Sequence, residues 1–331
     1  MDLNKIAVVI LNYNGAHLLK EYLPTVIKYS KEANIYVIDN ASTDQSIEYL
    51  QMVPEVKTIK LSSNLGYAGG YNEGLKSVKE PFLCLLNSDV KVTENWLKPI
   101  LDEFGSKTDV SIIQPKILDL KNPEVFEYAG AAGGYMDKFG YPYCRGRIFD
   151  TVEKDNNQYD DRQVIFWASG ACLFIKNEVF KSLGGFDDRF FAHMEEIDLC
   201  WRAFNKNHKA IYLSNSVIFH LGGGTLTYQT TNKTFLNFRN SLYTITKNVG
   251  KGYFNILMSR LILDGVAAAK FLFQLKPNHT LAILKAHLSF YRHYKDFRKS
   301  SNWTSSKTNY YDTKSVVWSY FIRGCKKFDC L

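Results

Sequence analysis

The stretch FLCLLNSDV at residues 82–90 decides the expected fold. It begins as an unbroken apolar run, which is typical of a strand buried on both faces of a parallel sheet. The run stops at three small polar residues, Asn87, Ser88 and Asp89. Ligands of open α/β sheets bind beyond the carboxyl ends of the strands, so we expect the Asp89 carboxylate to point into a crevice. A strand that merely ends in an Asx-type turn is the plainer alternative.

The sequence upstream repeats the same alternation of strand, polar turn and helix. Apolar runs at residues 6–11, 35–38 and 56–61 predict three more strands, and the segments between them have helical spacing. This rhythm predicts a doubly wound, mostly parallel α/β sheet. Polar turns at one edge of such a sheet indicate a nucleotide crevice. The glycines of the third turn do not form GxGxxG after the first strand, which argues against a dinucleotide site.

A second group of polar residues lies at the start of a predicted helix. Glu195, Glu196 and Asp198 all fall in its first turn, where the helix dipole alone would favour acidic residues. Glu195 and Asp198 share one face, and Arg202 follows Asp198 by four residues. Carboxylates clustered beside apolar residues push their pKa values apart, and a general base requires such a shift.

His220 ends a pair of short predicted strands at residues 209–213 and 217–219 and precedes the glycines at 222–224. The glycines would let an anion approach, although a lone histidine is more often structural. Residues 117–162 have no clear periodicity and are interpreted as a loop. That loop is either a flap over an acceptor site or an ordinary solvated insertion.

Four segments together resemble a known family. These are VVILNYN at 8–14, VIDNASTD at 37–44, NLGYAGGYN at 64–72 and LNSD at 86–89. In order and spacing they are similar to the motifs of glycosyltransferase family 2, and most of all to its bacterial rhamnosyltransferase-like branch. The resemblance covers about residues 5–245 and implies the GT-A fold.

The resemblance also implies roles for single residues. The donor nucleotide sugar would lie against Asn12, Tyr13, Asn14, Asp39, Asn64, Gly66, Asn87, Ser88 and Asp89, with Asp39 accepting a hydrogen bond from the base. Asp89 and His220 would hold a divalent metal, Mg²⁺ or Mn²⁺. Glu196 would be the catalytic base, with Glu195 as its rival and Asp198 in the same motif.

Two positions depart from the family pattern. Asn87 stands where the first Asp of the family's Asp-x-Asp metal motif is expected, and Glu196 stands where the family has an Asp. The first departure leaves a single protein carboxylate for the metal. One carboxylate suffices when diphosphate oxygens and water complete the ligand shell. The second departure places the base one methylene further from the helix.

The implied function is an inverting, metal-dependent hexosyltransferase. Its donor would be a pyrimidine nucleotide sugar, a dTDP- or UDP-sugar such as dTDP-rhamnose, and its acceptor a saccharide, most naturally a lipid-linked one in cell-surface polysaccharide synthesis. One alternative is a sugar-nucleotide pyrophosphorylase, but residues 12–15 lack the basic Gly-rich loop that such an enzyme needs. The other is a non-catalytic nucleotide-sugar-binding module. Asn87 supports that alternative and the carboxylates at 195–198 oppose it.

Charge divides the chain of 331 residues unevenly. Residues 228–331 contain 17 Lys and Arg against 4 Asp and Glu, although the net charge of the whole chain is only +8. We therefore expect a GT-A catalytic domain at 1–227, with a nucleotide-sugar half to about 115 and an acceptor half from 116, and a basic amphipathic helical extension at 228–331. Such helices suit an anionic membrane surface, or they cap the catalytic domain. No motif supports binding to nucleic acid.

The chain begins without a visible signal peptide, and its six cysteines have no metal-type spacing. Cys84, Cys172 and Cys200 fall in apolar or helical patterns and are expected to be reduced core residues. These features predict a cytoplasmic protein, peripheral at the inner face of the cell membrane if the basic extension binds lipid.

Overall fold

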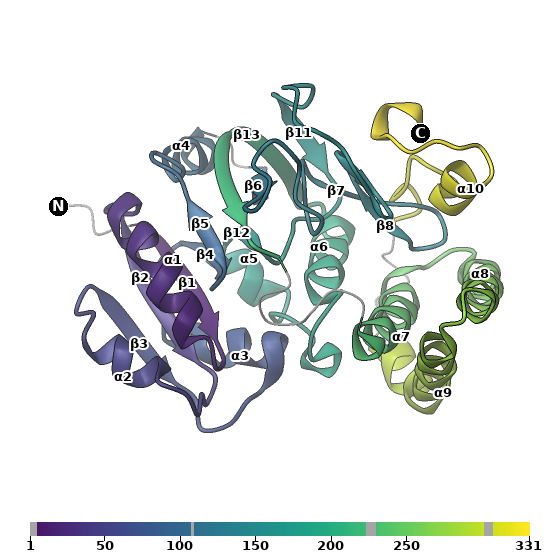
Figure 1. The fold of residues 1–331 in the computed structure, drawn as a ribbon, viewed down its shortest axis with the longest axis horizontal. Helices are drawn as coiled ribbons and strands as arrows, with labels where there is room; N and C mark the ends of the chain where they lie inside the picture. The colour runs from purple at the N-terminus through teal and green to yellow at the C-terminus, as the bar shows by residue number, and fades with distance from the viewer. Residues whose placement is uncertain (1–4, 107–108, 223–229, 301–306) are drawn as a thin grey trace.

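The computed structural model describes residues 5–106, 109–222, 230–300 and 307–331. A nine-stranded sheet forms its centre (Figure 1). Its first half is parallel, in the order β3-β2-β1-β4. These strands are β1 (Ile6–Asn12), β2 (Ala33–Asp39), β3 (Val56–Lys60) and β4 (Phe82–Asn87). The predicted α/β sheet is therefore confirmed, and β1, β2 and β4 end side by side at one edge.

The second half of the sheet is mixed. β12 pairs antiparallel with both β4 and β6, whereas β13 runs parallel to β6 and antiparallel to β5 and β11. The strands are β5 (Val90–Val92), β6 (Val110–Asp119), β11 (Arg162–Ile165), β12 (Cys172–Lys176) and β13 (Lys209–His220). The two short strands expected before His220 are one strand, interrupted by a register shift between Leu213 and Val217.

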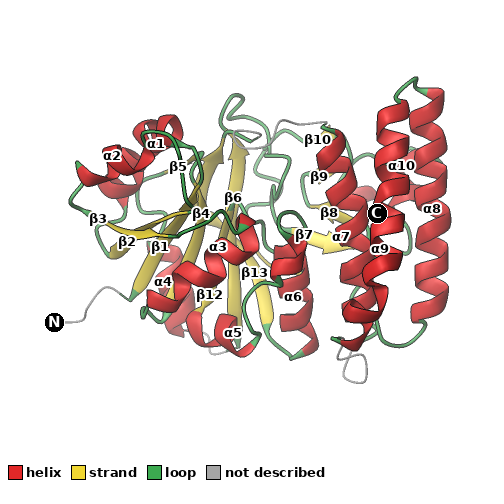
Figure 2. Cartoon of the chain, turned by 90° about the horizontal axis from the view of Figure 1, so that it is seen from below, coloured by secondary structure: helices red, strands yellow, loops and turns green. Residues whose placement is uncertain are grey.

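Alternate residues of the central strands face two separate cores, because side chains alternate across a strand. Val8 of β1 belongs to one core and Val9 to the other. The core with Val8 is covered by α1 (Ala16–Tyr29), α2 (Ser46–Gln51) and α4 (Lys98–Ser106). The core with Val9 is covered by α3 (Gly66–Gly74), α5 (Asn177–Ser182) and α6 (Glu195–Asn205). Helices on both faces explain why the strands are apolar throughout (Figure 2).

The interpretation of residues 117–162 as a loop was wrong. Strand β6 continues to Asp119, and a separate four-stranded antiparallel sheet follows. Its strands are β7 (Gly134–Met136), β8 (Pro142–Cys144), β9 (Arg147–Ile148) and β10 (Thr151–Val152). Gly140 and Gly146 turn the chain between them at positive φ, 75° and 91°. Strands of two or three residues are too short to show an alternating pattern, so the sequence could not reveal them.

The C-terminal third is helical, as expected. It contains α7 (Thr231–Asn248), α8 (Tyr253–Phe273), α9 (Pro277–Lys299) and α10 (Val316–Phe321). Short 3-10 turns complete the described elements at Leu75–Ser77, Asp188–Phe190 and Phe328–Cys330. Cys325 and Cys330 form a disulfide, and the other four cysteines are buried thiols. Within the described residues, no helix is long and apolar enough to span a membrane.

Candidate active site

The turns after β1 and β2 are tied together by side chains. Asn12 is fully buried and donates through Nδ2 to Asp39 Oδ1 (3.2 Å) and to Ser42 Oγ (3.2 Å). The backbone N–H of Ser42 donates to Asp39 Oδ2 (3.0 Å). Asn14 has a positive φ of 52° and accepts from the Thr43 N–H (2.7 Å). The Asp39 carboxylate is thus held at the sheet edge, while Tyr13 stays 40% exposed beside it.

A third turn joins this edge through Asn40, a residue that the sequence analysis did not single out. Its Nδ2 donates to Asn64 Oδ1 (3.0 Å) and to the Gly66 carbonyl (3.0 Å), and its Oδ1 accepts from the Leu65 N–H (2.9 Å). Asn64 Oδ1 also accepts from the Gly66 N–H (2.9 Å). Asn64 and Gly66 are therefore joined to the residue that follows Asp39, and their contact with a nucleotide stays a prediction. Asn40 connects the turn after β2 to the turn at residues 64–66. Its position directly after Asp39 in the sequence was the one signal that pointed to this role.

Gly66 is required where α3 meets the loop at residues 190–194. Its φ is +71°, and a Cβ there would lie 2.6 Å from the ring of Phe191. The Phe191 carbonyl accepts from the Tyr67 N–H at the start of α3 (2.8 Å). Phe191, His193 and Met194 all have positive φ values, 65°, 70° and 73°. Non-glycine residues rarely adopt this conformation, and it persists only where surrounding contacts hold it.

Asn240 of α7 supplies those contacts. Its buried Nδ2 lies within hydrogen-bond distance of the carbonyls of Phe190 (3.1 Å), Ala192 (2.9 Å) and His193 (2.7 Å). Arg239 Nη2 donates to the Phe190 carbonyl as well (3.1 Å). Helix α7 therefore fixes the loop that leads into α6. Neither residue belongs to a motif in the sequence, so neither was predicted to contact this loop.

Asp89 and His220 lie together, as predicted. His220 Nε2 is 3.1 Å from Asp89 Oδ1, and both side chains are almost completely buried. Glu127 lies on the other ring nitrogen, with Oε1 3.2 Å from Nδ1. Burial disfavours charge on the imidazole, but Glu127 and Asp89 outweigh it and raise the pKa of His220 to about 10. Glu127 was missed because it falls in the segment interpreted as a loop.

The donor set at Asp89 and His220 fits a divalent cation. Adjacent ligand atoms on an octahedral Mg²⁺ or Mn²⁺ lie about 3 Å apart, close to the 3.1 Å separation seen here. A carboxylate beside Nδ1 is also the usual partner of a metal-bound histidine. Because the pKa of His220 is raised, a metal ion would have to displace the proton on Nε2 before this nitrogen could bind it. Among the described residues there is no cluster of three or more acidic, His or Cys side chains able to hold a metal. Diphosphate oxygens and water can complete such a ligand shell.

Asn87 and Ser88 border the same position. Asn87 Nδ2 is 3.5 Å from His220 Nε2, and both Asn87 and Ser88 are partly exposed. The Leu221 N–H donates to the Asp89 carbonyl (3.0 Å), so the end of β13 is tied to the end of β4. Gly223, Gly224 and Thr225, from the glycine-rich stretch after His220, lie outside the described residues.

The three carboxylates of α6 have different environments. Both oxygens of Asp198 are bound: Oδ2 by Arg202 Nε (2.8 Å) and Lys247 Nζ (2.7 Å), and Oδ1 by Asn248 Nδ2 (2.9 Å). Burial opposes its charge, but Lys247 and Arg202 outweigh burial and lower its pKa. Asp198 therefore anchors α6 to α7, and its side chain is fully buried, so an acceptor from solvent does not reach it.

Glu195 and Glu196 are left for proton transfer. Each has an enclosed Oε2 with no hydrogen-bond partner. Burial raises the pKa of Glu195 well above its ordinary value, and the charge of Glu196 adds to this. Burial also raises the pKa of Glu196, to about 7, and backbone N–H groups limit the rise. Glu195 is only 4% exposed, whereas Glu196 is partly exposed, so Glu196 is the carboxylate that a solvent-borne hydroxyl can reach.

Tyr67 and Gly170 form the wall beside Glu196. The Tyr67 hydroxyl donates to the Gly170 carbonyl (2.8 Å). A Cβ at Gly170 would lie 3.1 Å from that hydroxyl and 3.8 Å from Cδ of Glu196. Burial, with the charges of Glu195 and Glu196 among the smaller causes, raises the pKa of Tyr67 well above its ordinary value. Tyr67 is therefore a neutral hydrogen-bonding group at the site.

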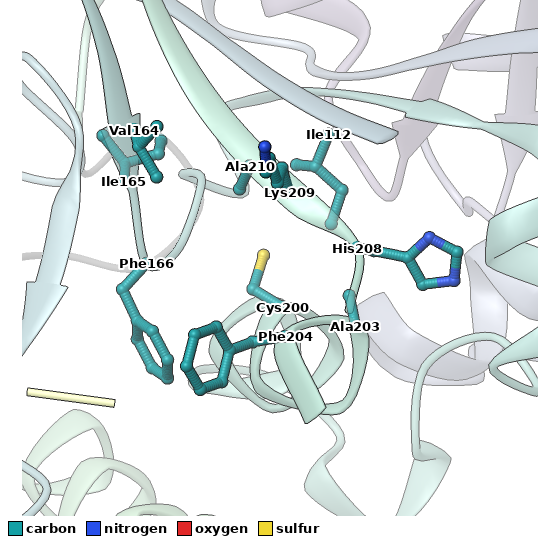
Figure 3. Close-up of a pocket in the computed structure, with 10 residues that line it drawn as sticks. All are labelled: Ile112, Val164, Ile165, Phe166, Cys200, Ala203, Phe204, His208, Lys209 and Ala210. Atoms are coloured by element: carbon teal, nitrogen blue, oxygen red, sulfur yellow. The ribbon is translucent and has the colours of Figure 1, made fainter. Parts of the chain in front are cut away.

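A small pocket elsewhere carries no chemistry. It lies between α6, β11 and β13, and Figure 3 shows the Cys200 sulfur pointing into the space beside Phe166 and Ala210. Burial raises the pKa of this thiol to about 12, so it is not a nucleophile at neutral pH. None of the predicted site residues lines this pocket.

Strands that end at one acidic edge, followed by a mixed half with a carboxylate-bearing helix, define a glycosyltransferase of the GT-A fold class. Residues 7–183 match the family described as Glycosyl transferase family 2. The match spans more than half of the chain, and the chain belongs to this family.

Two relatives illustrate the similarity. The N-acetylglucosaminyl-diphospho-decaprenol L-rhamnosyltransferase of Mycobacterium tuberculosis is 23% identical over 229 residues, or 64% of this chain and 75% of the relative. The low-salt glycan biosynthesis hexosyltransferase Agl10 of Haloferax volcanii is 25% identical over 210 residues, or 62% of this chain and 63% of the relative. The predicted resemblance to the rhamnosyltransferase-like branch is confirmed, and the chain is a glycosyltransferase.

Solved structures support the fold. S. aureus TarS 1–349 in complex with UDP-GlcNAc superposes with a TM-score of 0.58 at 15% identity, covering 98% of this chain and 93% of that one. GalNAc-T7 with UDP, GalNAc and Mn²⁺ gives a TM-score of 0.55 at 19% identity, over 71% of this chain and 48% of that one.

Proposed function

We propose that the protein transfers a sugar from a pyrimidine nucleotide sugar to a saccharide acceptor, with inversion at the anomeric carbon. One arrangement supports this proposal. Asp89 and His220 form a buried pair after β4. Glu196, whose Oε2 has no hydrogen-bond partner and whose pKa is raised to about 7, lies beside Gly170, and the carbonyl of the next residue, Ala171, accepts from the Asn87 N–H. Asp89 and His220 are suited to bind a leaving diphosphate through a metal ion, and the glutamate is suited to accept a proton from a hydroxyl.

In the proposed reaction Glu196 accepts the proton of the acceptor hydroxyl. The oxygen attacks the anomeric carbon as the bond to the diphosphate breaks, so one glycosidic bond forms and the nucleoside diphosphate leaves with the electron pair. A single in-line displacement inverts the configuration and needs no protein nucleophile. Tyr67 and Gly170 border the position where the hydroxyl would be deprotonated.

Asp89 and His220 are the residues that would hold a divalent ion. Such an ion supplies charge neutralisation to the leaving diphosphate. Glu127 would orient His220 for this role through the Nδ1 side of the ring. Asn87 contributes an uncharged amide here, so the protein offers a single carboxylate to the ion.

Asp39 supports a pyrimidine donor. Its two oxygens accept one hydrogen bond each, from Asn12 and from the Ser42 N–H. A carboxylate has about four acceptor positions, so it can also accept the imide N–H of a uracil or thymine base. Tyr13 is exposed at this edge and offers a ring face to the base. UDP- and dTDP-sugars, dTDP-rhamnose included, share this imide.

The acceptor is proposed to be a lipid-linked saccharide of cell-surface polysaccharide synthesis. The Mycobacterium tuberculosis relative is named for a decaprenol-linked substrate, which supports this choice. The basic C-terminal helices support a position at the cytoplasmic face of a membrane, where such acceptors lie. The two departures from the family pattern, Asn87 and Glu196, leave the proposed chemistry intact.

A donor panel tests the proposal. The full chain is incubated with UDP-, dTDP- and GDP-sugars and Mn²⁺, and release of nucleoside diphosphate is measured. We expect slow hydrolysis of UDP- or dTDP-sugars, and slower hydrolysis after Asp39→Asn. Glu55→Gln is the control, because Glu55 is exposed and precedes β3, at the edge of the sheet opposite to Asp39. A pyrophosphorylase would instead form nucleoside triphosphate from pyrophosphate, and a non-catalytic module would bind a donor without turnover.

A further inference from the structure

Helix α8 turns two of its three charged residues, Arg260 and Asp264, toward the protein, whereas Lys270 is exposed. Arg260 and Asp264 are 3% and 0% exposed and form an ion pair of 2.7 Å. Arg260 Nη1 also donates to the Gly140 carbonyl (2.9 Å), and Asp264 accepts from the Tyr141 hydroxyl (3.1 Å). His287 of α9 lies 3.2 Å from the second Asp264 oxygen. The polar groups of α8 are therefore satisfied from the inside.

The outward face of α8 is apolar. Phe254, Met258, Ile262 and Val266 recur every four residues and are 70%, 40%, 66% and 61% exposed. This arrangement is the reverse of a helix that packs on a protein core and faces water. A helix that faces water carries polar residues on its outward face. The outward face of α8 is therefore suited to contact with an apolar phase or an apolar partner surface instead of water.

The apolar residues continue onto both neighbours of α8. The turn into α9 presents Phe273 and Leu275, which are 87% and 88% exposed. Helices α10, α8 and α9 lie one below another at one end of the molecule in Figure 1. Lys270 Nζ of α8 lies 4.2 Å from the centre of the Phe321 ring of α10. The exposed apolar residues of α9 and α10 are Leu281, Leu284, Leu288, Tyr291, Trp318, Phe321 and Ile322. We call these residues, with those of α8 and its turn, the apolar end surface.

The exposed charges on α8, on the turn after it and on α9 as far as Lys295 are all positive. Lys270, Lys276, Lys285 and Arg292 are exposed on α8, α9 and the turn between them. Between residues 253 and 295 the only acidic residue is Asp264, which is buried in its ion pair. Positive charge without exposed carboxylates complements an anionic surface and repels another basic one.

We propose that the apolar end surface docks on an anionic lipid bilayer. Helix α8 and the first half of α9 would lie in the plane of the interface, with Phe273 and Leu275 inserted among acyl chains and the lysines at phosphate level. No described helix is long and apolar enough to cross the bilayer, which agrees with in-plane docking. A second copy of this chain is a poorer partner, because a two-fold contact would bring Lys270, Lys276 and Lys285 against their own copies. The inference goes beyond the proposed transfer reaction and does not depend on it.

Vesicle co-sedimentation of the full chain tests the proposal. We expect binding to vesicles of phosphatidylglycerol mixed with phosphatidylcholine, weakened by high salt, and little binding to phosphatidylcholine alone. Ile262→Glu and Phe273→Glu should each reduce binding at least tenfold. Met52→Glu is the matched control, because Met52 is 67% exposed on the opposite part of the chain. Lys270→Glu combined with Lys276→Glu should also weaken binding strongly, whereas Lys31→Glu should not.

All of these substitutions change exposed side chains, so circular dichroism and thermal melting should match those of the unsubstituted chain and show that folding is intact. The proposal is overturned if the full chain ignores anionic vesicles at low salt, or if Ile262→Glu and Phe273→Glu bind as well as Met52→Glu. Light scattering without lipid measures the oligomeric state and tests whether a second copy of the chain covers the surface. A stable dimer that Ile262→Glu dissolves would assign the surface to a second copy instead.

Discussion

Glu127 Oε1 lies 3.2 Å from Nδ1 of His220, while Asp89 Oδ1 lies 3.1 Å from Nε2 of the same ring. The imidazole is thus held between two buried carboxylates that come from different parts of the chain. Asp89 follows β4, and Glu127 follows β6 by eight residues. A histidine in this setting is oriented by one carboxylate and presented to ligands beside the other.

The first prediction concerns Glu127. Glu127→Gln should weaken Mn²⁺ binding by about 10- to 100-fold, because His220 loses the carboxylate that orients it. Calorimetric titration with Mn²⁺ measures this without any turnover. Glu124→Gln is the control, since Glu124 lies in the same segment with its side chain 79% exposed. Equal Mn²⁺ affinity in the two variants would remove Glu127 from the metal site.

The second prediction concerns Asp89. Asp89→Asn should remove most metal-dependent turnover, since the one protein carboxylate at the proposed diphosphate position becomes neutral. The loss of one preorganised electrostatic group corresponds to about 2–4 kcal/mol in the activation free energy. Donor hydrolysis with Mn²⁺ or Mg²⁺ measures it. A wild-type rate in this variant would show that the diphosphate binds elsewhere.

The contacts around Glu127 show what the sequence could and could not predict. Asp39, Asn64 and Asp89 were identified because they lie in segments that resemble the family motifs, and Asp39 and Asp89 also lie at or just beyond the carboxyl ends of apolar strands. Glu127 follows no such strand, and the small sheet beside it has strands of two or three residues. Asn240 and Lys247 act on residues about 50 positions away, and local periodicity contains no information about such pairings. The long-range part of the site therefore needed the structure.

The third prediction separates Glu196 from Glu195. Glu196→Gln should keep donor binding and lose transfer by about 10²–10⁴-fold, the usual contribution of a general base. Glu195→Gln should lose less, because Glu195 is only 4% exposed. Transfer by the unsubstituted chain should rise with pH through about 7, where Glu196 gives up its proton. The reverse ranking of the two variants would make Glu195 the base.

The same pKa has a consequence for stability. In the folded chain the pKa of Glu196 is raised from 4.5 to about 7, so the folded state binds this proton more tightly than the unfolded state does. Its stabilising effect is complete below pH ~4.5 and is lost as pH rises through about 7. Glu196→Gln should therefore melt higher than the unsubstituted chain at pH 8 and close to it at acidic pH. A variant that melts lower at pH 8 would contradict the raised pKa.

The fourth prediction concerns the wall of the site. Gly170→Ala places a methyl group 3.1 Å from the Tyr67 hydroxyl and 3.8 Å from Glu196 Cδ, so the hydroxyl must move by a few tenths of an ångström and its hydrogen bond to the Gly170 carbonyl is disturbed. We expect transfer to fall at least tenfold while the melting temperature changes little. Gly105→Ala is the control, because a Cβ there meets nothing within 4 Å. That change should leave transfer unaltered and stabilise α4 by up to about 1 kcal/mol. Equal transfer in both variants would place the acceptor away from Tyr67.

The last prediction tests Asp198 as an anchor of α6. Asp198→Ala leaves Lys247 and Arg202 without their shared buried carboxylate, which should lower the free energy of unfolding by about 3–5 kcal/mol. The pKa of Asp198 is lowered in the folded chain, so its contribution is present above the unfolded pKa and disappears as pH falls through the folded one. Urea unfolding at pH 7 and at acidic pH measures both effects, with Asp102→Ala on the exposed side of α4 as the control. Lys247→Met removes the other partner of the ion pair. If Asp198→Ala and Lys247→Met both unfold at lower urea concentration, the ion pair holds α6 to α7. If Asp198→Ala unfolds like the control but has lost transfer, Asp198 acts in catalysis instead.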